Sequence, residues 1–159
     1  MAFQLRDFDP LRDKAAALAF IDGSQAYEAA FEPDRRTDAT VAEDYYAAMM
    51  AEVAGRQSRI FIAEVEGRAV GWGVFVVDEA QVYVVPEERT YGYIAELYVD
   101  EALRGQGVGQ ALIAACEDEA RRLGLPHIKI GHLTANARAA AIYERAGYAP
   151  YTTERRKRL

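Results

Sequence analysis

The chain has 159 residues and a mass of 17.7 kDa, and 51% of its residues are hydrophobic while 28% are charged. This length suits a single domain, and the composition supports a packed core and excludes a wholly disordered chain. The formal net charge of −6 argues against the broad basic surface that nucleic-acid binding requires.

Charge is distributed unevenly along the sequence. Residues 1–103 hold 9 basic and 20 acidic side chains, whereas residues 104–159 hold 10 basic and 5 acidic ones. The second segment is therefore suited to an anion and the first to a cation. Part of this asymmetry comes from a basic tail at residues 154–159, which we expect to be solvated.

Several classes of protein are excluded by the residue content. No stretch approaches the roughly 18 apolar residues of a membrane helix, and the N-terminus lacks a basic and then apolar signal segment. The single cysteine, Cys116, cannot form an internal disulfide, and with only His127 and His132 a zinc site would need carboxylate ligands. We therefore expect a cytoplasmic protein without a metal, and with neither a membrane nor a nucleic acid as partner.

The first third of the chain is predicted to form a strand and two helices. A short strand starts at residues 3–5, and Asp9-Pro10 is typical of an N-cap and a first helical residue, which opens a helix over 11–20. Residues 22–39 contain a glycine and a proline among polar residues and favour a loop, either alone or with a short helix in it. Residues 40–54 form the second helix, with a Thr-Val-Ala-Glu capping box at its start and a glycine after its end.

The middle of the chain is rich in residues that favour strands. Residues 60–65 and 69–77 are predicted to pair as a hairpin around the turn Glu66-Gly67-Arg68. Residues 78–90 fit either a strand or a turn, because a valine-rich run is followed by a proline and two glutamates. Residues 91–99 predict a further strand.

The last third of the chain alternates helices and strands. Residues 107–123 carry an apolar stripe at helical spacing and end at a glycine, and residues 128–130 predict a short strand. A helix that begins at Thr134 or Asn136 and continues to residue 146 is followed by a strand at 148–152. The order β-α-α-β-β-β-α-β-α-β, without an internal repeat or a linker, indicates one mixed α/β domain.

The most informative segment is the turn Arg104-Gly-Gln-Gly-Val-Gly109, which connects a predicted strand to a predicted helix. The first N–H groups of a helix have no partner within the helix, and the helix dipole places partial positive charge there. Glycines let an anion approach the backbone, and Arg104 adds a cation that can chelate phosphate oxygens. The turn is therefore a candidate phosphate site.

Two common phosphate motifs do not fit this turn. A P-loop needs Lys and then Ser or Thr after its last glycine, but Gln110 and Ala111 follow here. A dinucleotide fingerprint needs a further glycine where Gln110 or Leu112 stands. The remaining interpretations are the pattern R-x-x-G-x-G and a glycine-rich turn that binds nothing.

Three segments together resemble a known family. They are Glu96-Leu-Tyr-Val99, the turn Arg104–Gly109, and Asn136-x-x-Ala139-x-x-x-Tyr143-Glu-Arg-Ala-Gly147-Tyr148. In their order and spacing the chain resembles the GCN5-related N-acetyltransferase (GNAT) family over residues 93–150. The resemblance implies one GNAT-like domain over 1–159, with a mixed, mostly antiparallel sheet flanked by helices, and acetyl-CoA as co-substrate.

The resemblance also implies where acetyl-CoA binds. Its diphosphate would lie on the turn at 104–110, and its pantetheine arm would pair like an extra strand with the backbone of residues 97–99. The cofactor-binding residues implied in this way are Leu97, Tyr98, Val99, Arg104, Gly105, Gln106, Gly107, Val108, Gly109, Gln110, Asn136, Ala139 and Tyr143.

Acetyl transfer to an amine needs a base, because a lysine-like amine of pKa about 10.4 is almost fully protonated at neutral pH. Glu96 is the first candidate, since its apolar strand neighbours would raise its pKa, and the resemblance assigns this role to a glutamate at this position. The alternatives are a Glu96 that pairs with an arginine or faces solvent, and His132 or a chain of water molecules as the base.

Tyr143 is the candidate acid. Its phenol can donate a hydrogen bond to the leaving thiolate, and it lies about two turns beyond Asn136 on the same predicted helix face. The alternative is an aromatic residue that packs between helix and sheet. Cys116 falls near the apolar stripe of its helix, and we interpret it as a core residue rather than a nucleophile.

The acceptor is expected to depend on residues 1–92. We expect the acceptor to be a primary amine of a small molecule, which attacks acetyl-CoA directly in a ternary complex. The alternatives are a protein N-terminus or lysine as acceptor, and a non-catalytic sensor of acyl-CoA. A homodimer is also an open interpretation. Aromatic residues are candidates to line the acceptor pocket, and the alternative is that they only pack in the core. Acids of the second helix are candidates to attract a cationic acceptor, and the alternative is a solvated helix face. The aromatic candidates are the ten tyrosines, among them Tyr83, Tyr91 and Tyr93, and the acidic candidates are the acids of the second helix, among them Glu43 and Asp44.

Overall fold

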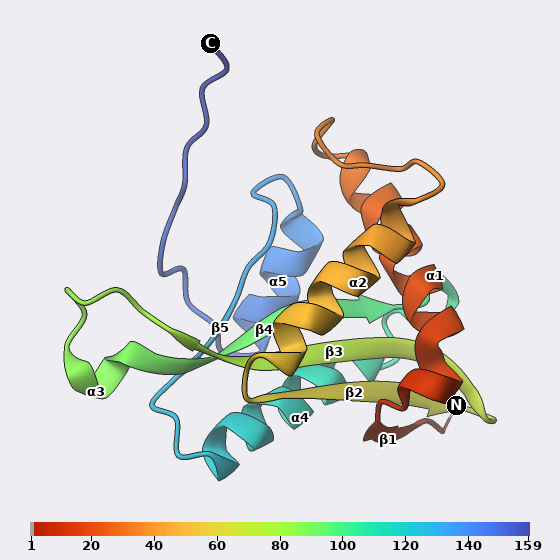
Figure 1. The fold of residues 1–159 in the computed structure, drawn as a ribbon, viewed down its shortest axis with the longest axis horizontal. Helices are drawn as coiled ribbons and strands as arrows, with labels where there is room; N and C mark the ends of the chain where they lie inside the picture. Colours follow the sequence, from red (N-terminus) through yellow and green to blue (C-terminus); the bar gives the residue numbers. More distant parts are fainter. Residues whose placement is uncertain (1) are drawn as a thin grey trace.

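A five-stranded sheet forms the middle layer of the protein (Figure 1). The structure is a computed structural model, and it describes residues 2–159. The strands lie in chain order across the sheet: β1 (Gln4–Asp7), β2 (Ser58–Val65), β3 (Arg68–Glu79), β4 (Thr90–Val99) and β5 (Ile128–Ile130). The pairs β1–β2, β2–β3 and β3–β4 are antiparallel, and β5 runs parallel to β4. The predicted mixed, mostly antiparallel sheet is therefore confirmed.

Helices cover both faces of the sheet. The helices α1 (Pro10–Ala29) and α2 (Val41–Ala54) pack against one face, and α4 (Val108–Arg122) packs against the other (Figure 1). The remaining elements are α3 (Pro86–Arg89), a 3-10 turn (Glu101–Leu103) and α5 (Ala137–Arg145). In the part of the chain that the structure describes, no helix combines the length and the apolar character that crossing a bilayer requires.

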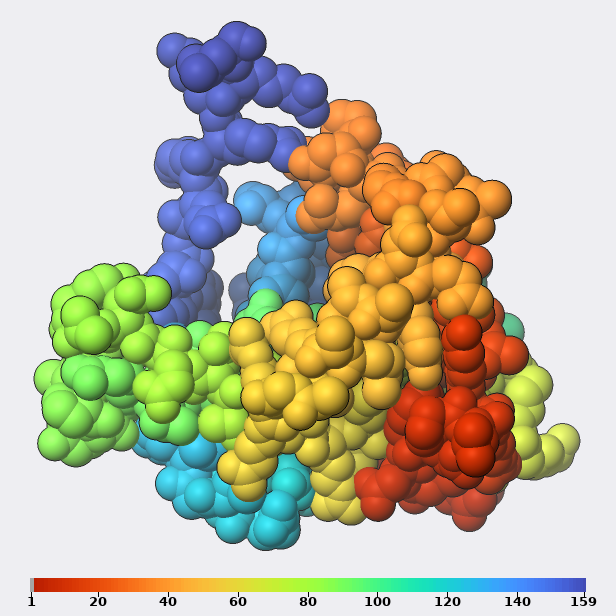
Figure 2. Space-filling model, viewed as in Figure 1, coloured from red at the N-terminus to blue at the C-terminus, as the bar shows by residue number. Residues whose placement is uncertain are grey.

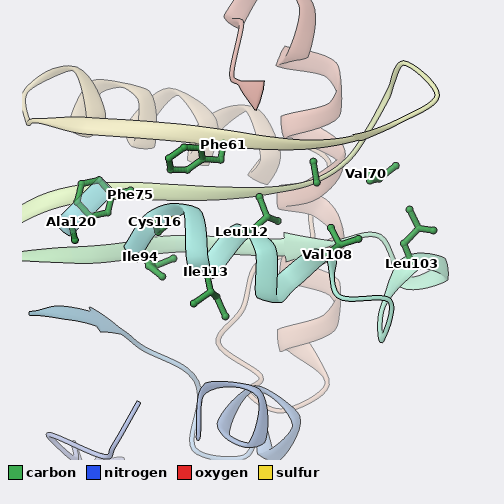
Figure 3. Close-up of a cluster of buried hydrophobic side chains, with 11 residues drawn as sticks. Phe61, Val70, Phe75, Ile94, Leu103, Val108, Leu112, Ile113, Cys116 and Ala120 are labelled. Atoms are coloured by element: carbon green, nitrogen blue, oxygen red, sulfur yellow. The ribbon is translucent and has the colours of Figure 1, made fainter. Parts of the chain in front are cut away.

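Two apolar cores hold these layers together. The core under α4 joins Leu112 and Cys116 of the helix to Phe61 and Phe75 of the sheet (Figure 3). The core under α1 and α2 contains Trp72, whose side chain is fully buried. Each large apolar side chain of this kind stabilises the fold by about 1.5–3 kcal/mol. Cys116 is a core residue, as predicted, and burial raises the pKa of its thiol to about 12.

A bulge interrupts β4 at Ala95. Val74 of β3 lies opposite Glu96, and the next residue of β3, Phe75, lies opposite Ile94, so Ala95 has no partner. Side chains alternate between the two faces of a strand, and one extra residue reverses that alternation. Ile94 consequently packs with the α4 core, while Glu96 faces α1 and α2.

The helix predicted over 11–20 is longer than expected, and the loop predicted for 22–39 is in part wrong. Asp9 caps the helix as predicted, through a hydrogen bond from the N–H of Leu11, but the helix continues to Ala29. Gly23 lies inside it and has a packing role: a Cβ there would lie 2.3 Å from the hydroxyl oxygen of Tyr98. A single glycine within a helix is tolerated when the fold needs the space.

The second helix has the predicted bounds but not the predicted cap. Thr40 is the N-cap residue of α2, yet its backbone is close to helical and its hydroxyl makes no bond to a helix N–H. The hydroxyl oxygen instead lies 3.0 Å from a carboxylate oxygen of Asp38 and 3.0 Å from one of Asp44, and its single hydrogen can be donated to either. The capping-box prediction is therefore wrong, because nearby acids compete for the hydroxyl group.

The ambiguous segment 78–90 forms an extension of β3, a turn and the short helix α3. The valine-rich run at 82–85 is not a strand, because the backbone turns there. One arginine side chain binds two of its carbonyl oxygens. Arg89 donates to the carbonyl oxygens of Val82 and Val84.

The prediction of a last strand at 148–152 is wrong. The N–H of Tyr148 bonds to the carbonyl of Tyr143 and closes the end of α5, and Pro150 has no N–H to offer a neighbouring strand. The chain then leaves the sheet as an extended segment (Figure 1). Figure 2 shows this segment (dark blue) meeting the loop after α1 (orange), where Arg156 pairs with Glu32 and Asp34.

Close packing of β3 against β4 requires glycine at position 71. A Cβ on Gly71 would lie 2.6 Å from the carbonyl oxygen of Tyr98, which belongs to the backbone and cannot move away freely. We expect Gly71→Ala to lower the free energy of unfolding by about 1–3 kcal/mol, as measured by urea denaturation. Gly55→Ala is the matched control, since its nearest atoms would be 3.6 Å away and its backbone is helical, so its effect should stay within about 1 kcal/mol. Equal losses in both variants would contradict this packing argument.

Candidate active site

A cavity of about 400 Å³ opens beside the C-terminal half of β4. Its other walls are the start of α4, one face of α5, the end of β5 and the second half of α1. The pairing of β5 with β4 stops at Ile94, one residue before the bulge. The edge of β4 from 95 to 99 therefore has no neighbouring strand on this side within the described residues, and it faces the cavity.

The glycine turn lies at the end of this free edge. Gly105 and Gly107 have φ values of 81° and 86°, in the left-handed region that favours glycine. Gly107 is the N-cap of α4, and the first helical bond runs from the N–H of Ala111 to its carbonyl. The N–H groups of residues 108–110 therefore have no helical partner, as the sequence predicted. Gly109 does not have a left-handed backbone, and a Cβ there would make only an ordinary contact at 3.8 Å.

Arg104 is held by aromatic rings. Its guanidinium carbon lies 5.1 Å from the ring centre of Tyr27 and 5.6 Å from that of Tyr98. Its Nε donates to the carbonyl of Val99 at 3.0 Å, which leaves the terminal nitrogens without a protein acceptor among residues 2–159. The side chain is therefore oriented by the protein before any ligand binds.

Three arginines without a carboxylate partner line the same cavity. They are Arg104, Arg138 and Arg145, and none of them forms an ion pair within the described residues. Most other arginines are paired, for example Arg6 with Asp13 and Arg35 with Glu28. Unneutralised positive charge together with free N–H groups makes this cavity suitable for a multiply charged anion.

Glu96 lies half-buried between this cavity and a second one. The phenol of Tyr45, on α2, donates a hydrogen bond to Oε1 of Glu96. Burial raises the pKa of Glu96 to about 7, with a further contribution from the negative charge of Glu28, while the bond from Tyr45 acts in the opposite direction. The alternative of a Glu96 paired with arginine does not hold for the described residues. The environment instead gives a carboxyl group that titrates near neutral pH.

The second cavity, of about 560 Å³, lies between α1 and α2. Ser24, Glu28 and Glu96 line both cavities, so Glu96 is reached from two sides. The arginines of the second cavity are neutralised: Arg35 bonds to Glu28, and Arg36 bonds to other acids of the loop and of α2.

Tyr143 lines the first cavity, as predicted. Burial raises the pKa of its phenol to about 12, and the negative charges of Glu28 and Glu96 add to this shift. The ring of the exposed His132 stands edge-on to it, with ring centres 5.6 Å apart. Tyr143 therefore keeps its proton at neutral pH and can act as a hydrogen-bond donor.

Asn136 is fixed as the N-cap of α5. Its side-chain oxygen accepts a hydrogen bond from the N–H of Ala139 at 3.1 Å. The residues predicted from the resemblance that line the first cavity are Glu96, Leu97, Tyr98, Val99, Arg104, Gly105, Gly107, Gly109, Gln110, Asn136, Ala139 and Tyr143. Two others do not: Gln106 turns back to the carbonyl of Ala102, and the side chain of Val108 is buried in the core.

Four of the ten tyrosines predicted as pocket candidates line the cavities, namely Tyr27, Tyr98 and Tyr143 in the first and Tyr45 in the second, whereas Tyr83, Tyr91 and Tyr93 line neither. Tyr83 is 85% exposed in the turn before α3, Tyr91 stacks on His127, and Tyr93 packs in the core under α1 and α2. Of the two acids, Asp44 lines the second cavity, while Glu43 pairs with Lys14 outside it.

The structure brings to the cavities several residues that the sequence pattern does not single out for a site. Ser24, Tyr27 and Glu28 lie in the segment predicted as a loop, although their spacing places them on one face of a helix. Tyr45 reaches Glu96 only through the packing of α2, and no local sequence pattern predicts that contact. Arg138 and Arg145 are seven residues apart on α5, which is two turns of one face.

Comparisons with known proteins agree with this arrangement. The model of the Acetyltransferase (GNAT) family matches residues 23–148. A curated protein from Azospirillum brasilense named IAA acetyltransferase is 30% identical over 91 residues, which cover 57% of this chain and 54% of that protein. The chain spans about half the length of the curated relatives it matches.

Solved structures share the whole fold. A mutant of the BH1408 protein from Bacillus halodurans superposes with a TM-score of 0.83 at 18% identity, covering 100% of this chain and 99% of that one. A GCN5-related N-acetyltransferase from Ralstonia eutropha JMP134 gives a TM-score of 0.77 at 20% identity, covering 99% of each chain. At these identities the likeness concerns the fold.

Glu96 makes stability depend on pH in a defined direction. Its folded-state pKa of about 7 lies above the ordinary 4.5, so its contribution is fully present below about pH 4.5 and is lost as the pH rises through about 7. Glu96→Gln removes this ionisation and should stabilise the protein by about 1–2 kcal/mol more at pH 8.5 than at pH 5, measured by urea denaturation. Glu154→Gln, in the exposed tail, changes the net charge equally and should show no such difference. A gain for Glu96→Gln that is the same at both pH values would contradict the assignment.

Proposed function

The chain belongs to the acetyltransferase (GNAT) family, and we propose that it transfers the acetyl group of acetyl-CoA to a primary amine of a small molecule by direct attack in a ternary complex. The observation that carries this proposal is the position of Glu96, which lines both cavities and titrates near neutral pH. A base in this position can serve two substrates that approach from opposite sides.

The first cavity has the chemistry that acetyl-CoA requires. When bound, acetyl-CoA supplies an activated acetyl group as a thioester, on a carrier with several phosphate charges. The free N–H groups at 108–110 and the side chains of Arg104, Arg138 and Arg145 are suited to hold those phosphates. The free edge of β4 at residues 97–99 offers backbone groups to the amide-containing arm, although the Val99 carbonyl already accepts a bond from Arg104.

Glu96 acts as the base in this proposal. An amine of ordinary pKa about 10.4 enters as the ammonium form, and an ionised Glu96 attracts it. Proton transfer to a carboxylate of pKa about 7 is uphill by about 3.4 pKa units, or roughly 5 kcal/mol. Removal of water from the amine on binding lowers this difference, because desolvation disfavours the charged ammonium.

Tyr143 stabilises the leaving sulfur by hydrogen bonding rather than by giving up its proton. Its pKa of about 12 lies well above the value of about 8.5 for a thiol, so complete transfer would cost about 5 kcal/mol. A hydrogen bond to the developing thiolate needs no such transfer and lowers the energy of the transition state.

The second cavity is the proposed acceptor site. Apart from Glu96, all its lining residues come from the segment 24–48, which supports the division into an acceptor-determining part at 1–92 and an acetyl-CoA part at 93–150. Its volume of about 560 Å³ lies in the range of small-molecule sites. A small amine is therefore favoured over a protein acceptor.

Glu96→Gln tests the role of the base. We expect kcat to fall by about 10²- to 10⁴-fold, with the affinity for CoA unchanged in calorimetry. In the wild type, kcat/KM should decrease below about pH 7 as Glu96 takes up a proton, and the variant should lack this limb. A variant that keeps both its turnover and the limb would move the base to another group.

The unpaired arginines of α5 test the phosphate site. Arg138→Ala combined with Arg145→Ala should weaken CoA binding about tenfold and should reduce its dependence on salt, because two charge-assisted contacts are lost. The control is Arg155→Ala with Arg158→Ala, which removes the same charge from the tail. Equal losses of affinity in both double variants would indicate a general charge effect instead of a local site.

A further inference from the structure

Tyr45 and Glu96 come from distant parts of the chain and meet through their side chains. The phenol of Tyr45 donates to Oε1 of Glu96, and Oε2 has no protein partner among residues 2–159. We propose that Tyr45 is a positioning residue: it holds the Glu96 carboxylate by Oε1 and leaves Oε2 as the atom that takes the proton of the acceptor amine. The second part of this inference rests on the proposed function, and the first part does not.

Tyr45 can only donate in this contact. Burial raises the pKa of its phenol well above the ordinary value of 10, and the charges of Glu96, Glu28 and Glu52 raise it further. The phenol therefore stays protonated over the whole range in which Glu96 titrates. A donor that is always present stabilises the ionised carboxylate and opposes the effect of burial.

The helix α2 fixes the direction of the phenol. Tyr45 stands four residues after Val41 and four before Met49, and both of these side chains are buried. Residues at this spacing lie on one face of a helix, so the packing of α2 aims Tyr45 toward β4. The side chain is 36% exposed, which fits a residue at the edge of an open cavity.

Among residues 2–159, no cationic side chain competes with Tyr45 for Glu96. From α1, Glu28 faces the carboxylate and repels it, and Tyr93 of β4 and Tyr143 of α5 are the other titratable groups that sense its charge. The arginines of the second cavity are bound to other acids. Within the described chain, Tyr45 is thus the one group that favours the ionised form of Glu96 through a direct contact.

Direct titration of Glu96 tests the positioning role without any need for activity. Carboxyl carbons of ¹³C-labelled glutamates are followed by NMR against pH, and the Glu96 signal is assigned by its absence in Glu96→Gln. We expect a pKa of about 7 in the wild type and a rise of about one unit in Tyr45→Phe, the size of a lost hydrogen bond to a charged group. Tyr46→Phe, which alters the neighbouring tyrosine that packs in the core, should leave the value unchanged.

An unchanged pKa in Tyr45→Phe, or an equal rise in Tyr46→Phe, would overturn the inference. The spectra also report whether each variant is folded, and Tyr45→Met provides the same comparison with a flexible apolar side chain should the Phe variant unfold.

Kinetics then separate the inference from the proposed function. With an amine that the wild type acetylates, Tyr45→Phe should move the acidic limb of kcat/KM upward by the same amount as the NMR shift, and kcat should recover to within about twofold at pH 9. A uniform loss at all pH values would contradict the positioning role. Absence of turnover in the wild type, together with the NMR shift, would reject the function and leave the Tyr45–Glu96 contact in place.

Discussion

One extra residue in a strand organises the whole site. Ala95 has no partner in β3, and this bulge reverses the alternation of side chains along β4. Before it, Ile94 packs into the α4 core, and after it Glu96 turns to the opposite face, toward Tyr45. In a regular strand Glu96 would share the face of Ile94, where a carboxylate would be buried among apolar side chains. The pairing with β5 also ends at Ile94, so the reversal that exposes Glu96 coincides with the free edge of β4.

The two cavities differ in whether their arginines are neutralised by acidic partners. Arg104, Arg138 and Arg145 line the first cavity without acidic partners among the described residues, while the arginines of the second are neutralised locally. Glu96 lies where the cavities meet and is held by a neutral donor instead of a cation. Its burial therefore costs free energy that an arginine would have offset, and the result is a carboxyl group with a pKa near 7. Such a group is unfavourable for stability and useful for proton transfer.

The sequence predicted those features that depend on local chemistry. The glycine turn, the helix behind it and the strand at 128–130 follow from positive-φ positions, hydrophobic periodicity and β-rich composition, and the structure reproduces their bounds within a residue. Features that depend on distant contacts were missed or wrong. The bulge at Ala95 has no signature in an apolar strand, and Tyr45 meets Glu96 only after α2 has packed. The prediction of a strand at 148–152 is wrong because a strand requires a partner, and the chain after Gly147 leaves the sheet.

In the proposed function, two substrates meet at Glu96. A crystal structure with CoA bound tests it most directly, since the electron density of the phosphates and of the sulfur locates both ends of one substrate. We expect the phosphates against the N–H groups at the start of α4, and the sulfur in the first cavity between Glu96 and Tyr143. Phosphates bound elsewhere, or a sulfur that lies far from Glu96, would contradict the proposed function.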